Sequence, residues 1–261
     1  MWVPGAPTRS PLRGVNSAVF NVGNSSLTQS MQLGIFAKTF VRPTLGEVLD
    51  AVVQHGLDCV QFNLACAGLP TLPERIAPGV AEEIHRELQQ RAITMAAVSG
   101  TFNMIHPDLR KRSDGLKRLT ELIEACRPLG TSVVTLCTGT RDPDDMWRRH
   151  PDNDSPAAWR DLLDSLSAVM PATEANHVTL AFEPETANVV NSARKARRLL
   201  DEVKSPCLKV LMDGANLFRS GDLPRMREIL NEAFDLLGRD IVLAHAKELG
   251  PDLHQIGRAH V

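Results

Sequence analysis

Three apolar, strand-like segments of this chain each end in a side chain that binds metal ions well. Each segment is four residues long, and they end at Glu183, Asp213 and His245. The intervals of 30 and 32 residues between these side chains are the lengths that one strand, one helix and two loops require. Consecutive strand–helix units of a parallel barrel place such side chains at equivalent points of its mouth. The sequence therefore predicts a metal site that a barrel assembles.

The chain from Gln32 onward alternates between short apolar runs and longer amphipathic segments. Seven runs predict strands, at 33–37, 59–64, 93–98, 133–137, 179–182, 208–212 and 241–244. Six segments predict helices, at 44–55, 78–91, 114–129, 156–176, 192–203 and 223–237. Several have start and stop signals, such as a capping box of Thr44 and Glu47, and Gly56, Gly130 and Gly238 just past helix ends. Strict alternation implies parallel strands, because parallel neighbours need a crossover connection.

The predicted fold class is α/β, a TIM (β/α)8-type barrel. Nearly every strand ends in polar or small residues, whereas a doubly wound sheet would concentrate such residues at one switch point. The first strand is also not followed by the GxGxxG pattern of a nucleotide-binding sheet. The chain ends sixteen residues after His245, so we expect an incomplete barrel of about seven strands that lacks strand 8. Its two edge strands would then be unpaired, which favours aggregation.

Composition excludes several classes of protein. A net charge of −2 with scattered Lys and Arg argues against a nucleic-acid partner. No apolar run reaches the roughly 18 residues of a membrane span. The five cysteines are widely spaced without a CxxC motif, which favours reduced thiols in a cytoplasmic protein. The sequence leaves the oligomeric state open, a homo-oligomer included.

Both ends of the chain are predicted to lie outside the barrel domain, which we place at residues 31–254. Residues 1–30 are rich in Ser and Pro and lack the apolar region of a secretory signal, so we interpret them as a disordered or mis-started extension. Residues 255–261 resemble the translation of a common sequencing-adapter oligonucleotide. We therefore interpret them as a non-native tail.

Four residues are candidates for catalysis. Glu183 is the first choice as both ligand and base. Glu185, two positions later, is a second inward-pointing acid, an acid behind the metal ligands, or a surface acid. His106 either binds a substrate hydroxyl or makes a hydrogen bond within its loop, and Lys247 either pairs with an anion at the mouth or is an ordinary surface lysine.

Three residues are candidates for substrate binding. Asn216 either contacts the substrate or caps the following helix. His106 belongs to this group as well. Arg141 lies in a loop, 138–147, that we expect to place it above the site.

These motifs resemble the xylose isomerase-like TIM barrels, in particular the sugar phosphate isomerase/epimerase group that includes the tagatose-type epimerases. The resemblance covers roughly residues 32–253, and its segments are 182–185, 213–218, 245–248 and, with weaker similarity, 99–107. It implies that Glu183, Asp213 and His245 hold one divalent ion, which is Mn, Mg, Co or Zn. The family's fourth ligand, a glutamate after strand 8, has no counterpart in this sequence.

The resemblance implies a sugar or sugar phosphate isomerase or epimerase. Such an enzyme removes a proton next to a carbonyl and passes through an ene-diolate. Because a ligand and a strand are missing, we expect this chain to bind metal weakly and to catalyse poorly. Two alternatives remain, a non-catalytic sugar-binding barrel and a metal-dependent hydrolase similar to an AP endonuclease, which would need more rim histidines and a basic groove.

Overall fold

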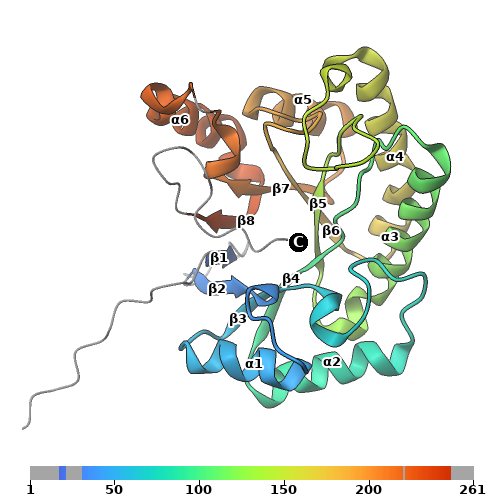
Figure 1. Ribbon diagram of the computed structural model, residues 1–261, viewed down its shortest axis with the longest axis vertical. Coiled ribbons are helices and arrows are strands. Elements are labelled where there is room, and N and C mark those ends of the chain that lie inside the picture. The colour runs from blue at the N-terminus through green and yellow to red at the C-terminus, as the bar shows by residue number, and fades with distance from the viewer. Residues whose placement is uncertain (1–17, 22–30, 220, 248–261) are drawn as a thin grey trace, which may run out of the picture.

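In the computed structural model of the protein, the described residues form eight strands that lie side by side in chain order and close into a barrel (Figure 1). The structure describes residues 18–21, 31–219 and 221–247. The strands are β1 (Ala18–Asn21), β2 (Gln32–Phe36), β3 (Cys59–Phe62), β4 (Thr94–Ser99), β5 (Val133–Cys137), β6 (Thr179–Glu183), β7 (Leu208–Asp213) and β8 (Ile241–Ala246). From β2 to β8 every pair is parallel, which confirms the predicted TIM-barrel class.

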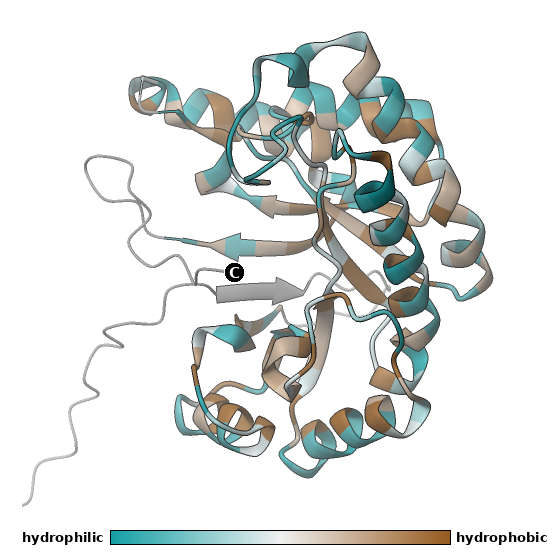
Figure 2. Ribbon diagram, turned by 45° about the vertical axis from the view of Figure 1, so that its right-hand side comes forward, coloured by the Kyte–Doolittle hydropathy of each residue, from teal (hydrophilic) through white to brown (hydrophobic). Residues whose placement is uncertain are grey.

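Within the described ranges, six helices connect the parallel strands and cover the outside of the barrel (Figure 1). They are α1 (Leu45–Gln54), α2 (Pro78–Gln90), α3 (Leu109–Leu129), α4 (Pro156–Ala175), α5 (Ala193–Val203) and α6 (Met226–Leu237). Short 3-10 turns lie in the connections, at Ala37–Thr39, Leu64–Ala67, Pro151–Asp154, Gly214–Leu217, Leu223–Arg225 and Gly238–Asp240. The helices show separate hydrophilic and hydrophobic faces (Figure 2). In the part of the chain that the structure describes, no helix is long and apolar enough to cross a membrane.

The N-terminal strand β1 corrects two expectations. It pairs antiparallel with β2 on one side and with β8 on the other, so the expectation of two unpaired edge strands is wrong. It also lies inside the 1–30 extension that we excluded from the fold. Its four residues stand in a stretch rich in Ser and Asn, which is why the sequence pattern did not reveal a strand. The rest of the extension and the predicted tail at 255–261 lie outside the described residues.

Local signals explain where the helices begin and end. The predicted capping box at Thr44 and Glu47 is present, with Thr44 Oγ1 accepting from Glu47 N at 3.3 Å. Helix α3 begins five residues before its predicted start because the Asp108 side chain accepts hydrogen bonds from the backbone of Arg110 and Lys111. Gly56 and Gly130 adopt φ of +71° and +80°, as expected after a helix, whereas Gly238 has φ −51° and continues into a 3-10 turn.

The barrel separates two buried regions. The larger lies between strands and helices and includes fully buried side chains such as Phe62, Leu122 and Phe182. The smaller is a layer of mainly small side chains from the strands, formed by Cys59, Ala96, Ala97, Ala181, Leu211 and Leu243. Since side chains alternate along a strand, the residues two positions after these point to the same side. Those residues include Gln61, Glu183, Asp213 and His245, so polar groups follow the apolar layer towards the carboxyl ends of the strands.

Candidate metal centre

The structure brings the three predicted metal ligands together. One side-chain ligand atom from each of Glu183, Asp213 and His245 lies within 4.8 Å of the others. Glu183 and Asp213 are the last residues of β6 and β7, and His245 lies in β8 directly opposite Asp213 in the parallel register. The strand order thus converts the spacing in the sequence into a single cluster at the barrel mouth.

The imidazole of His245 is oriented by a glutamine that the sequence analysis did not select. His245 Nε2 lies 2.7 Å from Gln61 Oε1, and Gln61 comes from β3. The other ring nitrogen, Nδ1, is buried and has no hydrogen-bond partner. It faces Asp213 Oδ2 at 3.6 Å and Glu183 Oε1 at 4.0 Å.

These residues fit a divalent metal ion. The buried Nδ1 without a hydrogen-bond partner is the atom that an ion would satisfy, and it faces two carboxylates. Two carboxylates and one imidazole suit hard to borderline divalent ions. Among the residues that the structure describes, no other group of His, Cys, Asp and Glu side chains has this geometry.

Lys247 supplies positive charge to the same acids. Its ammonium forms an ion pair with Asp213 Oδ2 and lies 4.0 Å from Glu183 Oε1. Burial acts to lower the pKa of Lys247, but the two carboxylates outweigh it and the pKa lies above its usual value. Lys247 was predicted to pair with an anion at the mouth. In the structure its partners are protein carboxylates, and its role in catalysis stays a prediction. The interpretation as an ordinary surface lysine is wrong, because only 18% of the side chain is exposed.

The two acids differ in their electrostatic environment. Burial raises the pKa of Glu183, and the nearby Asp213 adds to this effect. Burial also acts to raise the pKa of Asp213, but its charged surroundings, among them the ion pair with Lys247, outweigh it and leave the pKa below its usual value. The surroundings thus favour the charged form of Asp213 and the protonated form of Glu183.

Comparison with known proteins decides the family. The model of the xylose isomerase-like TIM barrel family matches residues 49–260, which is more than half of the chain. The chain belongs to this family. Among curated proteins, none matches.

Solved structures share the fold at low sequence identity. The 3-keto-D-glucoside 4-epimerase of E. coli is 17% identical with a TM-score of 0.59, over 76% of this chain and 73% of that one. A D-psicose 3-epimerase, solved in the presence of D-fructose, is 14% identical with a TM-score of 0.57, over 74% and 65%. A family protein from Mycobacterium smegmatis in complex with magnesium is 14% identical with a TM-score of 0.58, over 78% and 72%.

Two other predicted site residues, Asn216 and Glu185, also have described contacts. Asn216 donates from Nδ2 to Glu183 Oε1 at 2.5 Å, and its backbone oxygen accepts from Thr186 N at 3.0 Å. It therefore orients a predicted ligand. Glu185 is buried, with 6% exposure, and its Oε2 accepts from Asn188 Nδ2 at 3.3 Å. The interpretation of Glu185 as a surface acid is thus wrong, while an inner role agrees with its burial.

The loop residues His106 and Arg141 are held by other parts of the protein. His106 Nε2 lies 3.1 Å from Pro143 O, and its Nδ1 accepts from Asp108 N at 2.9 Å. The alternative of a loop hydrogen bond therefore describes His106 as the structure has it. Arg141 pairs with Asp161 of α4 at 2.5 Å and donates to Ile105 O at 3.2 Å. No contact between either side chain and the three ligands is present in the described structure.

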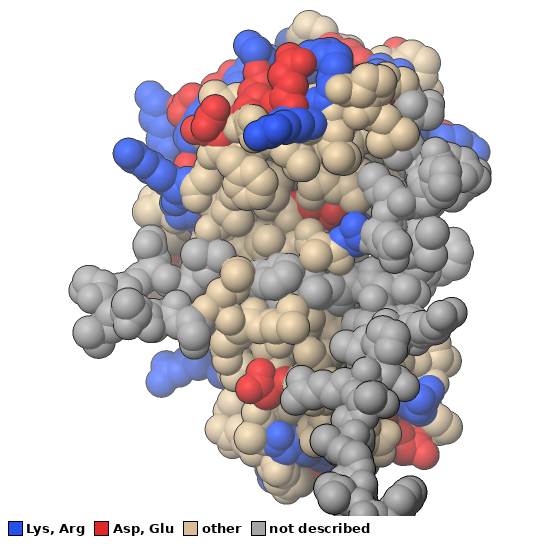
Figure 3. Space-filling model, turned by 90° about the vertical axis from the view of Figure 1, so that its left-hand side faces the viewer, with Lys and Arg blue, Asp and Glu red and all other residues tan. Residues whose placement is uncertain are grey.

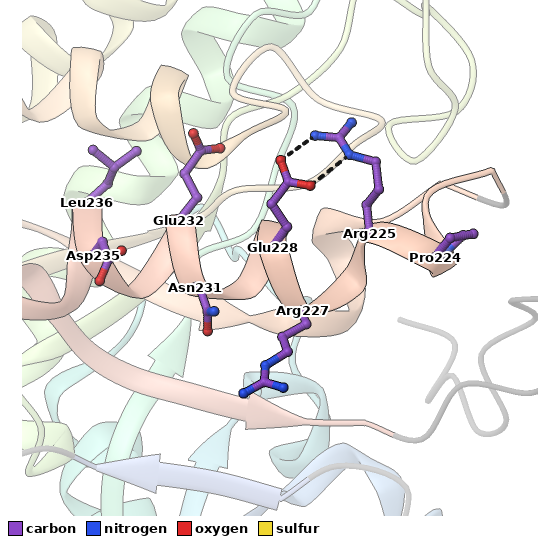
Figure 4. Close-up of a pocket in the computed structure, with 8 residues that line it drawn as sticks. All are labelled: Pro224, Arg225, Arg227, Glu228, Asn231, Glu232, Asp235 and Leu236. Atoms are coloured by element: carbon purple, nitrogen blue, oxygen red, sulfur yellow. Dashed lines mark hydrogen bonds and ion pairs between the residues drawn. The ribbon is translucent and has the colours of Figure 1, made fainter.

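The outer surface has charges of both signs and a hollow along α6. On the face shown in Figure 3, acidic and basic side chains are interspersed and form no stripe of one sign. A hollow along α6 is lined by residues between Pro224 and Leu236 (Figure 4). Arg225 and Glu228 in this hollow bind each other through two contacts of 3.1 and 2.8 Å. None of the predicted site residues lines it.

Proposed function

We propose that the protein is a divalent-metal-dependent isomerase or epimerase of sugars or sugar phosphates. The observation that carries the proposal is the meeting of Glu183, Asp213 and His245 within 4.8 Å at the carboxyl ends of three consecutive strands. Active sites of barrels of this type lie at that end. The fold neighbours that act on 3-keto-D-glucosides and D-psicose support the choice of a sugar, and the neighbour with magnesium supports the choice of a divalent ion.

In this proposal Glu183, Asp213 and His245 hold the ion. When bound, a divalent ion would polarise the substrate carbonyl and stabilise negative charge that develops on its oxygen. Asp213 and His245 serve mainly to fix the ion, because the pKa of Asp213 lies below its usual value and His245 presents a ring nitrogen without a hydrogen-bond partner. The donor set suits Mn, Mg, Co or Zn and does not choose among them.

Glu183 is the proposed base that removes the proton next to the carbonyl. Its carboxylate lies at the barrel mouth beside the other two proposed ligands, where the substrate carbonyl would bind. The hydrogen bond from Asn216 fixes its orientation. Lys247 lies 4.0 Å from Glu183 and can neutralise charge on the substrate oxygen, while the buried Glu185 is a second acid for proton exchange.

The test measures metal binding and turnover on the same protein. The full chain is stripped with a chelator, titrated with Mn²⁺ by calorimetry, and assayed with D-fructose, D-psicose and their phosphates by product chromatography. We expect one Mn²⁺ per chain and interconversion of at least one sugar pair. The variant Glu183→Gln should remove turnover, whereas Glu82→Gln on the exposed face of α2 should not.

The two alternatives give different results in this experiment. If the chain binds sugar, binds no metal and forms no product, it is a binding module and the proposal is wrong. Metal-dependent cleavage of abasic DNA without sugar turnover would identify the hydrolase instead.

A further inference from the structure

Gln61 makes an unusual set of contacts for a residue in the middle of a barrel strand. Its side chain lies inside the barrel and the residue is 4% exposed. Its amide nitrogen donates to Ser99 Oγ at 3.3 Å and to Thr135 Oγ1 at 3.2 Å, and its amide oxygen lies 2.7 Å from His245 Nε2. One side chain thus links β3 with β4, β5 and β8. A buried amide without such partners would be costly, so every bond contributes to holding it in place.

The orientation of the amide determines the protonation of His245. With both nitrogen hydrogens directed to hydroxyls, the amide oxygen faces the imidazole, and a carbonyl oxygen can only accept. The short contact of 2.7 Å then requires that His245 Nε2 carries the proton. The other nitrogen, Nδ1, must carry a lone pair in the neutral ring.

The position of Nδ1 agrees with this assignment. It has no hydrogen-bond partner although two carboxylate oxygens lie 3.6 and 4.0 Å away. A protonated Nδ1 beside two acids would be expected to approach one of them to about 2.9 Å. A lone pair on Nδ1 faces the same space as the oxygens of Glu183 and Asp213.

We propose that Gln61 is a positioning residue that holds His245 as the Nε2-protonated tautomer and so presents Nδ1 as the metal ligand. The inference rests on the proposed metal site. Metal-binding histidines commonly donate their second N–H to a carboxylate or carbonyl. Loss of this partner typically lowers the affinity for the metal by about 10- to 100-fold. Here a neutral amide performs this role, and it adds no third negative charge to a buried site that already holds two carboxylates.

The first test measures the tautomer directly in the metal-free protein. Long-range proton–nitrogen NMR at about pH 8, where a histidine is ordinarily neutral, distinguishes protonated from unprotonated ring nitrogens. The signals of His245 are assigned from the spectrum of His245→Gln. We expect Nε2 to be protonated and Nδ1 to be bare. A wild-type spectrum with the proton on Nδ1 would overturn the inference, and this result needs no variant of Gln61 to fold.

The second test compares three variants for Mn²⁺ affinity by calorimetry. Gln61→Leu keeps the size but removes both partners, so it should mix the two tautomers and weaken Mn²⁺ binding by about 10- to 100-fold. Gln61→Glu keeps an acceptor beside Nε2 and should keep the proton on that nitrogen, while its added negative charge makes its Mn²⁺ affinity a separate readout. The matched control is Thr173→Val, which removes one fully buried hydroxyl that donates to Val169 O within α4. It should leave both readouts unchanged.

The outcomes separate this inference from the proposed function. If Gln61→Leu shows the same tautomer and affinity as the wild type, Gln61 does not position His245. If the wild type binds no divalent ion but shows the Nε2 tautomer that Gln61→Leu loses, the metal proposal fails while the positioning of the ring by Gln61 stands.

Discussion

Two sets of polar residues at the barrel mouth behave differently. Glu183, Asp213 and His245 lie on strands, and their ligand atoms meet within 4.8 Å. His106 and Arg141 lie in the loops after β4 and β5, and their side chains bond to Pro143, Asp108, Asp161 and Ile105. A strand in a closed barrel fixes the direction of each side chain. A loop residue can instead turn to form hydrogen bonds with nearby loop groups.

The two loops are also built to bind each other. Asn103 accepts from Thr140 N at 3.0 Å and donates to Thr140 O at 2.8 Å. Gly139 has φ +84°, and a Cβ on it would lie 2.3 Å from Asn103 Oδ1. These contacts hold the two loops in one arrangement relative to each other. The comparison indicates that strand positions carry the chemistry and that these loop residues carry stability, a division that substitutions can test.

The largest expected effect is on metal binding by Asp213→Asn. Asp213 is 1% exposed, has a pKa below its usual value, and accepts from Ala215 N through its second oxygen at 3.0 Å. The amide keeps the shape but removes the charge, so Mn²⁺ affinity should fall by more than about 100-fold. Calorimetric titration measures the change. Asp144→Asn on the rim, where the side chain is 82% exposed, should bind Mn²⁺ as the wild type does. If Asp213→Asn binds Mn²⁺ as tightly as the wild type, the three strand residues are not the metal site.

The second effect concerns Lys247→Met. The ammonium neutralises two buried acids, so its removal should destabilise the metal-free protein by about 3 kcal/mol at neutral pH. Saturating Mn²⁺ should restore most of this loss, because the ion supplies the missing charge. Urea unfolding with and without Mn²⁺ measures both values. Lys117→Met is the control, since Lys117 is 76% exposed and should change stability little in either condition. A loss that Mn²⁺ does not reduce would mean that Lys247 contributes packing rather than charge.

Sequence patterns predicted the strand positions better than the loops because the barrel topology acts on every strand alike. The seven parallel strands and the acids that end β6 and β7 follow from periodicity and spacing. Gln61 was missed, although a polar residue inside the otherwise apolar run Cys59–Phe62 is itself a signal in a strand buried on both sides. The early start of α3 depends on a single cap at Asp108, and the partners of the Arg141 side chain lie on α4 and in the loop after β4. Such pairings depend on the tertiary structure and produce no periodic pattern in the sequence.

The third effect concerns Asp161→Asn. The difference in the free energy of unfolding between this variant and the wild type should depend on pH. Asp161 of α4 accepts from Arg112 of α3 at 3.0 Å and from Arg141 at 2.5 Å. Burial acts to raise the pKa of Asp161, but the two arginines outweigh it and hold the pKa below its usual value. A lowered pKa contributes stability that is present above the unfolded value of about 3.9 and is lost as pH falls through the folded value.

The variant should therefore lose about 1 kcal/mol at pH 7, since the acid is partly exposed, and Mn²⁺ affinity should stay unchanged. Below about pH 4 the difference between wild type and variant should shrink. Urea unfolding at several pH values, with Mn²⁺ titration at neutral pH, measures both. A constant difference across this range would show that the charge of Asp161 is not the source of its contribution.

The smallest effect is expected for His106→Gln. Both ring nitrogens of His106 already have partners within the loops, and a glutamine retains one donor and one acceptor. Stability should change by less than about 1 kcal/mol, and both Mn²⁺ affinity and the KM for an active sugar should match the wild type. The comparison is decided by the KM. A several-fold increase in KM with unchanged stability and Mn²⁺ affinity would return His106 to the substrate-binding role first predicted for it, because a purely structural loop residue has no means of changing sugar binding alone.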